Sequence, residues 1–101
     1  MTAIFIYVTT TDEKEAKKLA RHLLNKKLIA CANIFPIRSM FRWSGKIQDV
    51  PESVMILKTM KKNYAQIKKE IDALHSYTIT CITQLPVKPN KEYAAWLQKQ
   101  L

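Results

Sequence analysis

Residues 28–59 read LIACANIFPIRSMFRWSGKIQDVPESVMILKT, and this stretch decides the fold. The Ser44-Gly45 pair predicts a hairpin turn, because Gly45 is the single glycine of the chain and glycine reaches positive φ without strain. β-Branched and aromatic residues lie on both sides of the turn, as is typical of strands. We therefore predict one long β-hairpin.

This hairpin is too long for its domain. A strand from Ile29 to Trp43 would span about 50 Å at roughly 3.3 Å per residue, whereas a compact chain of this length is about 35 Å across. Pairing Trp43 with Lys46 sets Arg38 opposite Pro51, and Pro36 lies two residues from that point. Because proline cannot donate to a ladder, we predict a break there. It would separate a base in the core sheet from a projecting arm. The base comprises residues 29–35 and 53–59, and the arm residues 37–50.

The arm is rich in apolar side chains. They are Ile37, Met40, Phe41, Trp43, Ile47 and Val50. An isolated two-stranded ribbon is marginal in water, and an exposed apolar ribbon promotes aggregation. We therefore expect an obligate oligomer in which another subunit covers the arm.

The composition indicates a single domain over residues 1–101, with 48% hydrophobic residues to form a core. No apolar run approaches the ~20 residues of a membrane span. The start, MTAIFIYVTTTDEK, has no basic n-region and is interpreted as a first strand instead of a signal peptide. Two cysteines without CxxC spacing favour neither disulfides nor a zinc finger. A cytoplasmic location fits this pattern.

The net charge of +9 has two interpretations. A strongly basic chain can indicate a protein that binds nucleic acid. The simpler interpretation is that lysines solvate the outer faces of helices, since the charges are spread out and no arginine-rich block occurs. On the first predicted helix the basic residues Lys14, Lys17, Lys18 and Arg21 lie opposite the apolar Ala16, Leu19, Ala20 and Leu23. We expect a solvated surface and consider nucleic acid an improbable partner.

The rest of the chain supplies the other elements. Residues 3–9 predict a central strand buried on both faces. A helix should run to about Asn25 from a capping box, either Thr10 with Glu13 or Asp12 with Glu15. Asn63 should cap a second helix that ends near His75, residues 77–85 should form the fourth strand, and Asn90 should cap a short last helix. The order β-α-β-β-α-β plus a tail helix predicts an α+β, ferredoxin-like fold.

Enzyme signatures are missing. The sequence has no GxxxxGK[ST], GxGxxG, GxSxG or HExxH motif, and its eight carboxylates form no readable acid/base pair. Acylphosphatases and RNA-recognition motifs share this fold class, but the glycine-rich phosphate loop of the former and the glycine-and-aromatic sheet signature of the latter are absent. We predict a protein without catalytic activity.

The candidates for a binding site are few. His75 follows the second helix, and Tyr77 and Cys81 share strand parity in the predicted fourth strand. A His nitrogen and a Cys thiolate suit copper or zinc, although a helix-terminal His and an apolar Cys also occur without any metal. Lys46 beside the turn and Lys58 at the end of the hairpin could hold an anion between subunits, or could be ordinary surface lysines.

A resemblance to a known family rests on motifs spread over essentially the whole chain. They are LIACANI at 28–34, FxWxGKI at 41–47, MILKT at 55–59, LHxY at 74–77, LPV at 85–87 and YxxWL at 93–97. In this order and spacing the chain resembles the CutA family of divalent-cation tolerance proteins. The resemblance implies a ferredoxin-like subunit in a homotrimer whose arms pair between neighbours. It also implies a link to tolerance of divalent metals, especially copper, and a likeness to the PII signal-transduction proteins, which bind small effectors between subunits.

The sequence departs from the family pattern after the second helix. Family members read roughly His-Pro-Tyr-x-x-Pro-Glu, whereas this chain reads His75-Ser76-Tyr77-Thr78-Ile79-Thr80-Cys81. A cysteine of some members aligns with Val8, so only His75 remains of three residues proposed as copper ligands there. Either the site is lost, or Cys81 replaces the carboxylate and favours Cu(I). The glycine usual after Leu-Pro-Val is also missing.

Three functional hypotheses follow. The leading one is a non-enzymatic, cytoplasmic homotrimer that acts in divalent-metal tolerance, with copper or another divalent cation at His75 and Cys81. The alternative is a PII-like module that binds an anionic metabolite near Trp43, Lys46 and Lys58, in a cleft that Phe41 and Tyr77 also border. The third is a nucleic-acid-binding domain driven by the net charge.

Overall fold

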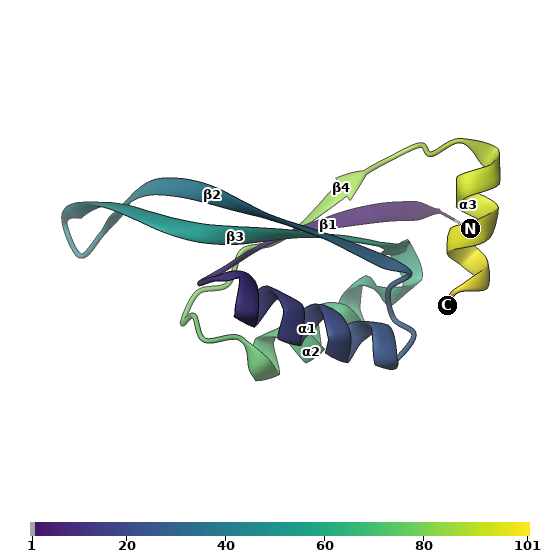
Figure 1. Ribbon diagram of the computed structural model, residues 1–101, viewed down its shortest axis with the longest axis horizontal. Coiled ribbons are helices and arrows are strands. Elements are labelled where there is room, and N and C mark those ends of the chain that lie inside the picture. The colour runs from purple at the N-terminus through teal and green to yellow at the C-terminus, as the bar shows by residue number, and fades with distance from the viewer. Residues whose placement is uncertain (1) are drawn as a thin grey trace.

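The computed structural model describes residues 2–101 and shows a four-stranded sheet with two helices on one face (Figure 1). The elements of these residues are β1 (Ala3–Thr10), α1 (Glu13–Asn25), β2 (Cys31–Trp43), β3 (Lys46–Met60), the 3-10 turn η1 (Lys61–Asn63), α2 (Tyr64–Leu74), β4 (Ile82–Pro86) and α3 (Lys91–Lys99). The strand order is β2-β3-β1-β4, with every neighbouring pair antiparallel. This is the predicted ferredoxin-like arrangement with an added tail helix.

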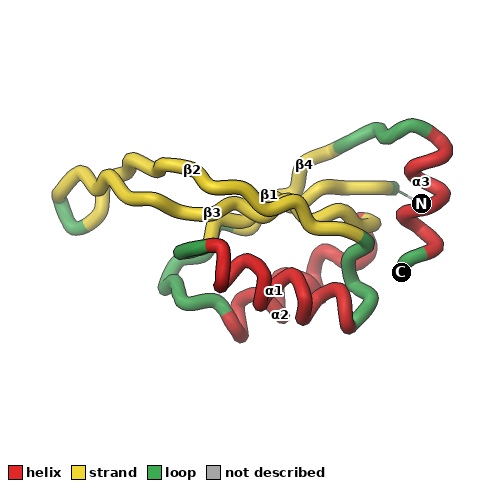
Figure 2. Tube along the Cα trace, in the orientation of Figure 1, coloured by secondary structure: helices red, strands yellow, loops and turns green. Residues whose placement is uncertain are grey.

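The core lies between the sheet and its helix layer (Figure 2). Alternate residues of β1, namely Ile4, Ile6 and Val8, face α1 and α2 and are at most 3% exposed. The β1 residues of the opposite parity, such as Phe5 and Tyr7, are only half-buried. The prediction that β1 is central is confirmed, but the prediction that both its faces are buried was wrong. Among residues 2–101, only α3 covers the second face of the sheet, at one end.

The hairpin has the predicted register, in which Trp43 pairs with Lys46 and Arg38 with Pro51. The predicted break was wrong, since β2 and β3 run unbroken through both prolines. Hydrogen-bonded and non-hydrogen-bonded pairs alternate in an antiparallel ladder. Counting from the Trp43–Lys46 pair that closes the turn places Pro36 and Pro51 in non-hydrogen-bonded pairs. Their missing N–H groups therefore leave the ladder intact.

The arm projects from the body of the subunit, as predicted. The last pair between β1 and β3 is Thr10 with Ser53, so in the part of the chain that the structure describes, residues 37–52 pair only with one another. The subunit is 45 Å long and only 24 by 21 Å in cross-section, and the arm forms one end of the long axis (Figure 1). Its base is shorter than predicted, because β2 begins at Cys31 and the buried Ile29 precedes it.

The turn at the tip is of type I′. Ser44 has φ 52° and Gly45 has φ 75°, and type I′ requires positive φ at both central residues. Gly45 adopts this conformation without strain, whereas Ser44 is held there by the pairing of the two strands.

The cap of α1 matches one of the two predicted pairs. The Asp12 carboxylate accepts a hydrogen bond from the Glu15 N–H at 2.8 Å, and Glu15 accepts one from the Thr11 N–H at 2.9 Å. The return bond thus reaches one residue further back than in a standard capping box.

The predicted capping by two asparagines was wrong. Asn63 precedes α2, but its side chain donates to the Leu28 carbonyl and to Thr59 Oγ1, both at 3.2 Å. Asn90 precedes α3, and its side chain donates to Glu92 at 3.1 Å. Tertiary hydrogen bonds in the first case, and a local side-chain bond in the second, replace the expected caps.

The fourth strand is shorter than predicted. β4 begins at Ile82, and residues 77–81, which we expected in the strand, form a loop. The backbone N–H groups of Ser76 and Tyr77 donate to the side chains of Glu15 and His75. Because side chains satisfy these donors, the loop does not need a ladder at this point.

Candidate functional site

Four ionisable side chains meet where the arm leaves the sheet. They are Glu15 of α1, Glu52 of β3, and His75 and Tyr77 of the loop between α2 and β4. The His75 and Tyr77 rings have centroids 4.7 Å apart, the Tyr77 hydroxyl contacts Glu52, and His75 Nε2 lies 3.9 Å from Glu15. We call these four residues the arm-root cluster.

His75 is the centre of this cluster, and its side chain is fully buried. Its Nε2 lies 2.8 Å from the carbonyl oxygen of Thr9, and its Nδ1 lies 3.0 Å from the Tyr77 backbone nitrogen. A carbonyl only accepts and an N–H only donates, so Nε2 carries the proton and Nδ1 is the acceptor. Both nitrogens are thus occupied. A metal ion at His75 would have to displace one of these hydrogen bonds.

Tyr77 joins the loop to the root of the arm. Its hydroxyl donates to Glu52, a carboxylate residue only 9% exposed. Burial, followed by the adjacent Glu52 carboxylate, raises the pKa of Tyr77 well above the usual 10.0. Tyr77 therefore remains a neutral hydrogen-bond donor at ordinary pH and does not offer a phenolate to a metal ion.

Glu15 links α1 to the same loop. Its two carboxylate oxygens accept hydrogen bonds from the backbone N–H groups of Thr11 at 2.9 Å and Ser76 at 3.0 Å. Burial by itself raises the pKa of Glu15, but these donors outweigh it and hold the pKa below the usual value. The carboxylate is thus charged, and both of its oxygens are occupied.

Cys81, the other predicted metal ligand, lies in the exposed loop before β4. Its sulfur is 3.5 Å from Thr83 Oγ1. The strand parity that grouped Cys81 with Tyr77 does not apply, because neither residue is in a strand. Within residues 2–101, no group of three or more His, Cys, Asp or Glu side chains is placed to hold a metal ion. The site at His75 and Cys81 stays a prediction.

The residues predicted for an anion site are widely separated. Lys46 is exposed at the tip of the arm, whereas the Lys58 ammonium lies 5.2 Å from the ring centre of Phe5 and 5.3 Å from that of Tyr93. The two lysines are twelve residues apart on β3, which corresponds to about 40 Å of strand. A single subunit cannot bring them together, so such a site would need two subunits.

The predicted assembly residues are exposed on the arm. Phe41 is 42% and Trp43 is 50% exposed, and their neighbours Met40 and Ile47 are 70% and 65% exposed. Large apolar side chains thus lie open on a ribbon that no other element of residues 2–101 covers.

The sequence analysis missed Glu15 and Glu52 as site residues. Glu15 is predicted only as a helix cap, and no sequence pattern links Glu52 to its partner Tyr77, which lies 25 residues away. The position of Glu52 next to Pro51, at the point where the arm begins, was the only indication.

No helix within residues 2–101 is long and apolar enough to cross a membrane.

Comparison with known proteins assigns the family. The model of the CutA1 divalent ion tolerance protein family matches residues 4–100. The Divalent-cation tolerance protein CutA of Archaeoglobus fulgidus is 45% identical over 96 residues, which cover 94% of each chain. The Divalent-cation tolerance protein CutA of Thermococcus kodakarensis is 36% identical, and the match covers 100% of this chain and 98% of that protein.

Solved structures agree with this assignment. The periplasmic divalent cation tolerance protein CutA of Archaeoglobus fulgidus superimposes with a TM-score of 0.94 at 43% identity, over 97% of each chain. CutA1 of Oryza sativa gives a TM-score of 0.95 at 33% identity, over 99% of this chain and 94% of its own. The chain described here therefore belongs to the CutA1 divalent ion tolerance protein family.

Proposed function

We propose that this chain is a non-enzymatic protein that acts in the tolerance of, or response to, divalent metal ions and works as a homotrimer. The observation that carries the functional part is the family match over residues 4–100, together with relatives named divalent-cation tolerance proteins. The four ionisable residues of the arm-root cluster support the absence of catalysis, because hydrogen bonds within the subunit already occupy them.

The exposed arm supports the trimer. Its apolar side chains are the kind of surface that another subunit covers, and an uncovered ribbon of this length invites aggregation. Neighbouring arms that pair with each other would extend the sheet and bury Phe41 and Trp43. Assembly would also bring the Lys46 of one subunit within reach of another subunit's surface.

We further propose that copper, if held at the predicted pair, is bound by the exposed Cys81 thiolate after His75 has released one hydrogen bond. Nδ1 would have to give up the Tyr77 N–H, or Nε2 the Thr9 carbonyl. Leaving a buried donor or acceptor unsatisfied costs about 1–3 kcal/mol. Binding at this place should therefore be weak, and softer ions such as Cu(I) should be preferred.

Two experiments test the proposal. Deletion of the gene in its own host should lower growth at raised copper, zinc or cobalt concentrations, and the wild-type chain should restore it. Unchanged growth at raised concentrations of all three metals would contradict the metal-tolerance role.

Separately, copper titration of the wild type, His75→Ala and Cys81→Ser should show weaker binding by both variants. Equal affinities of all three proteins would show that copper does not bind at His75 and Cys81. The tolerance role would then have to be explained by assembly.

The PII-like alternative is tested in the same preparation. An anionic metabolite held near Trp43, Lys46 and Lys58 of different subunits would raise the apparent stability, since a ligand that binds only the native state stabilises it. A thermal-shift screen of metals and anionic metabolites separates the two functions. A shift with metabolites alone, abolished by Lys58→Met, would favour the alternative.

We also propose a reducing compartment such as the cytoplasm. Both cysteines, Cys31 and Cys81, are free thiols, and Cys81 is exposed, so an oxidising compartment would put it at risk of oxidation. Relatives differ in this respect, since one is named periplasmic and another chloroplastic. Fractionation of the host with an antibody to the chain is the direct measurement.

A further inference from the structure

The charges of the subunit are distributed unevenly along its long axis. The end opposite the arm comprises residues 26–30, 58–63 and 87–101, and we call it the basic end (Figure 1). It holds eight of the seventeen basic residues and one of the eight acidic residues, Glu92. The arm, residues 37–50, and the segments at its root, residues 11–15 and 51–52, together hold four basic and five acidic residues. The net charge of the chain therefore comes mainly from one end, which the sequence alone did not indicate.

Contacts within the subunit hold the segments of the basic end together. The Leu28 carbonyl accepts hydrogen bonds from Thr59 at 2.6 Å and Asn63 at 3.2 Å, which places the loop after α1 against η1. The Lys61 N–H donates to the Thr2 carbonyl at 2.8 Å. On the other face of the sheet, Leu97 of α3 is buried in a cluster with Ala3 and Met60. Lysines that are far apart in sequence are thus held at one end of the subunit.

Most of these lysines are free of ion pairs. Lys26 pairs with Glu70 at 2.9 Å, and Lys58 lies between two aromatic rings. The other six are exposed and form no ion pair within residues 2–101: Lys27, Lys61, Lys62, Lys88, Lys91 and Lys99. The single acidic side chain of this end, that of Glu92, accepts a hydrogen bond from Asn90. The end therefore presents uncompensated positive charge to solvent.

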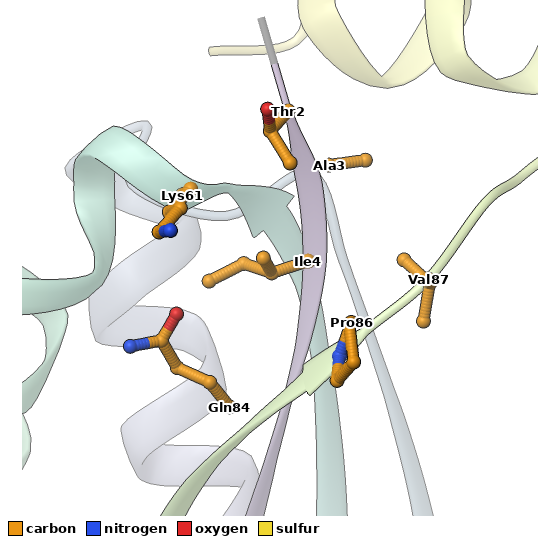
Figure 3. Close-up of a pocket in the computed structure, with 7 residues that line it drawn as sticks. All are labelled: Thr2, Ala3, Ile4, Lys61, Gln84, Pro86 and Val87. Atoms are coloured by element: carbon orange, nitrogen blue, oxygen red, sulfur yellow. The ribbon is translucent and has the colours of Figure 1, made fainter.

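Two hollows flank β1 at this end. The first, of about 150 Å³, is lined in part by Ile4, Lys61 and Gln84, and Figure 3 shows the Lys61 and Gln84 side chains on the same side of β1, flanking Ile4. The second, of about 260 Å³, is lined by Lys88 and Gln98. Since a water molecule occupies about 30 Å³, each hollow has room for a phosphate group beside an ammonium and an amide.

An exposed aromatic side chain lies on the same helix as two of the lysines. Trp96 on α3 is 44% exposed, and its ring centroid lies 5.5 Å from that of Tyr93. Lys91 and Lys99 belong to the same helix. Exposed aromatic rings between cations are what proteins use to stack unpaired bases while lysines follow the phosphates. A base inside a duplex cannot reach such a ring.

We propose that the basic end binds single-stranded nucleic acid without sequence preference. The lysines contact phosphates as point charges, and Trp96 stacks on a base. This property is separate from the metal-tolerance role and does not depend on it. Because lysines supply the cations, contacts to the backbone dominate and the affinity depends strongly on salt.

Fluorescence anisotropy with the assembled, full-length chain tests the proposal. The probe is a labelled oligo(dT) of about 20 nucleotides, longer than the usual site of roughly 4–16 nucleotides. We expect log K to fall linearly with log salt, by about 0.7 for each phosphate contact. The double variant Lys61→Glu/Lys62→Glu should lower the affinity about tenfold or more and reduce the salt slope by about 1.4. Thermal unfolding checks that the variant is folded.

A matched control keeps the change in net charge equal. Lys14 and Lys18 are exposed on α1, away from the basic end, and Lys14→Glu/Lys18→Glu should change the affinity less than threefold. Lys88→Glu/Lys91→Glu is a second test pair in case the first destabilises η1. Equal losses in the test and control pairs would overturn the proposal, because the net charge alone would then explain binding.

Trp96→Ala separates nucleic acid from a bare phosphate chain. It should weaken binding to oligo(dT) about tenfold and leave binding to inorganic polyphosphate unchanged. If the variant binds oligo(dT) as well as the wild type does, stacking is absent and the proposal is overturned in favour of a polyphosphate surface. Equal affinity for duplex and single strands would also contradict it.

Discussion

The base and the arm belong to the same two strands but differ completely in burial. In the base, Val54, Met55 and Leu57 are 0% exposed, whereas in the arm Met40 is 70% and Ile47 is 65% exposed. The residue types are similar. The difference is that β1 and the helix layer cover the base, while past the Thr10–Ser53 pair each strand of the arm has only the other. Neighbouring elements, and not composition, decide where the core ends.

Leu57→Ala in the base should give the largest loss in the free energy of unfolding. Leu57 is fully buried, and truncating such a side chain costs about 2–5 kcal/mol through lost transfer energy and a residual cavity. Urea unfolding of the purified protein measures the loss. Ile47→Ala on the arm is the matched control. Its effect should depend on protein concentration, since it weakens assembly, whereas a similar, concentration-independent loss in both variants would contradict the contrast between base and arm.

Phe41→Asp with Trp43→Asp should abolish assembly and leave the subunit folded. The two substitutions place charges on the apolar face that a neighbouring subunit is proposed to cover. Light scattering after size exclusion should show monomer or aggregate, with a far-ultraviolet spectrum close to that of the wild type. Arg42→Ala, between the two positions, serves as the control and should remain oligomeric. A double variant that is still trimeric would show that assembly rests elsewhere.

Tyr77→Phe tests the junction between base and arm. It leaves the Glu52 carboxylate without its hydroxyl donor, and hydrogen bonds to charged groups contribute about 1.5–3 kcal/mol. The pKa of Tyr77 is raised in the folded protein by burial and by Glu52. Its contribution is therefore complete below the unfolded value of 10.0 and is lost as the pH rises above it.

Unfolding of the wild type and of Tyr77→Phe between neutral pH and strongly alkaline pH measures both effects. The variant should be less stable at pH 7 and should lose less stability above pH 10 than the wild type does. Tyr7→Phe is the control, since the Tyr7 hydroxyl makes no hydrogen bond to any other residue of 2–101. If stability changed with pH in the same way in the wild type and in Tyr77→Phe, the Tyr77 hydroxyl would make no pH-dependent contribution at the junction.

The smallest effects on stability should come from two ion-paired carboxylates, one in the helix layer that covers the base and one on the arm. Glu70 joins α1 to α2 under the base, and the hydrogen bonds from His22 and then Lys26 lower its pKa to about 2. Stability from this lowered pKa is present above the usual 4.5 and is lost as the pH falls toward 2. Glu70→Gln should flatten the acid-unfolding profile in this window.

Asp49→Asn is the corresponding change on the arm. The Arg38–Asp49 pair has an N–O distance of 2.7 Å, but its side chains are 63% and 49% exposed. Exposed pairs contribute about 0–1 kcal/mol, so the free energy of unfolding should change by less than about 1 kcal/mol. A loss as large as that of Tyr77→Phe would mean that the arm is covered at this point.

The register of the hairpin followed from the sequence because a two-residue turn leaves no freedom. Once Gly45 is in the turn, every opposing pair down to Cys31 and Lys58 is determined. The effect of the prolines was misjudged for a related reason. Their similar position along the hairpin predicted an interruption, but each lies an odd number of residues from the Trp43–Lys46 pair, where no ladder N–H is needed.

The predictions around the site were less successful. Residues 77–81 have strand-like composition, yet Ser76 and Tyr77 bond to the side chains of Glu15 and His75, which come from segments distant in sequence or from the end of a helix. No local pattern contains such a partner. The copper prediction at His75 likewise considered residue type, whereas its availability depends on Thr9 and Tyr77.

The sequence by itself determined the order of the elements, the register of the hairpin and the projection of the arm. These properties depend on local turn geometry, strand parity and chain length. Tertiary structure alone decided which ionisable groups meet at the root of the arm and that most of the net positive charge lies at the opposite end. The physical reason is that hydrogen bonds and charges act through space between segments that only the folded sheet and helices bring together.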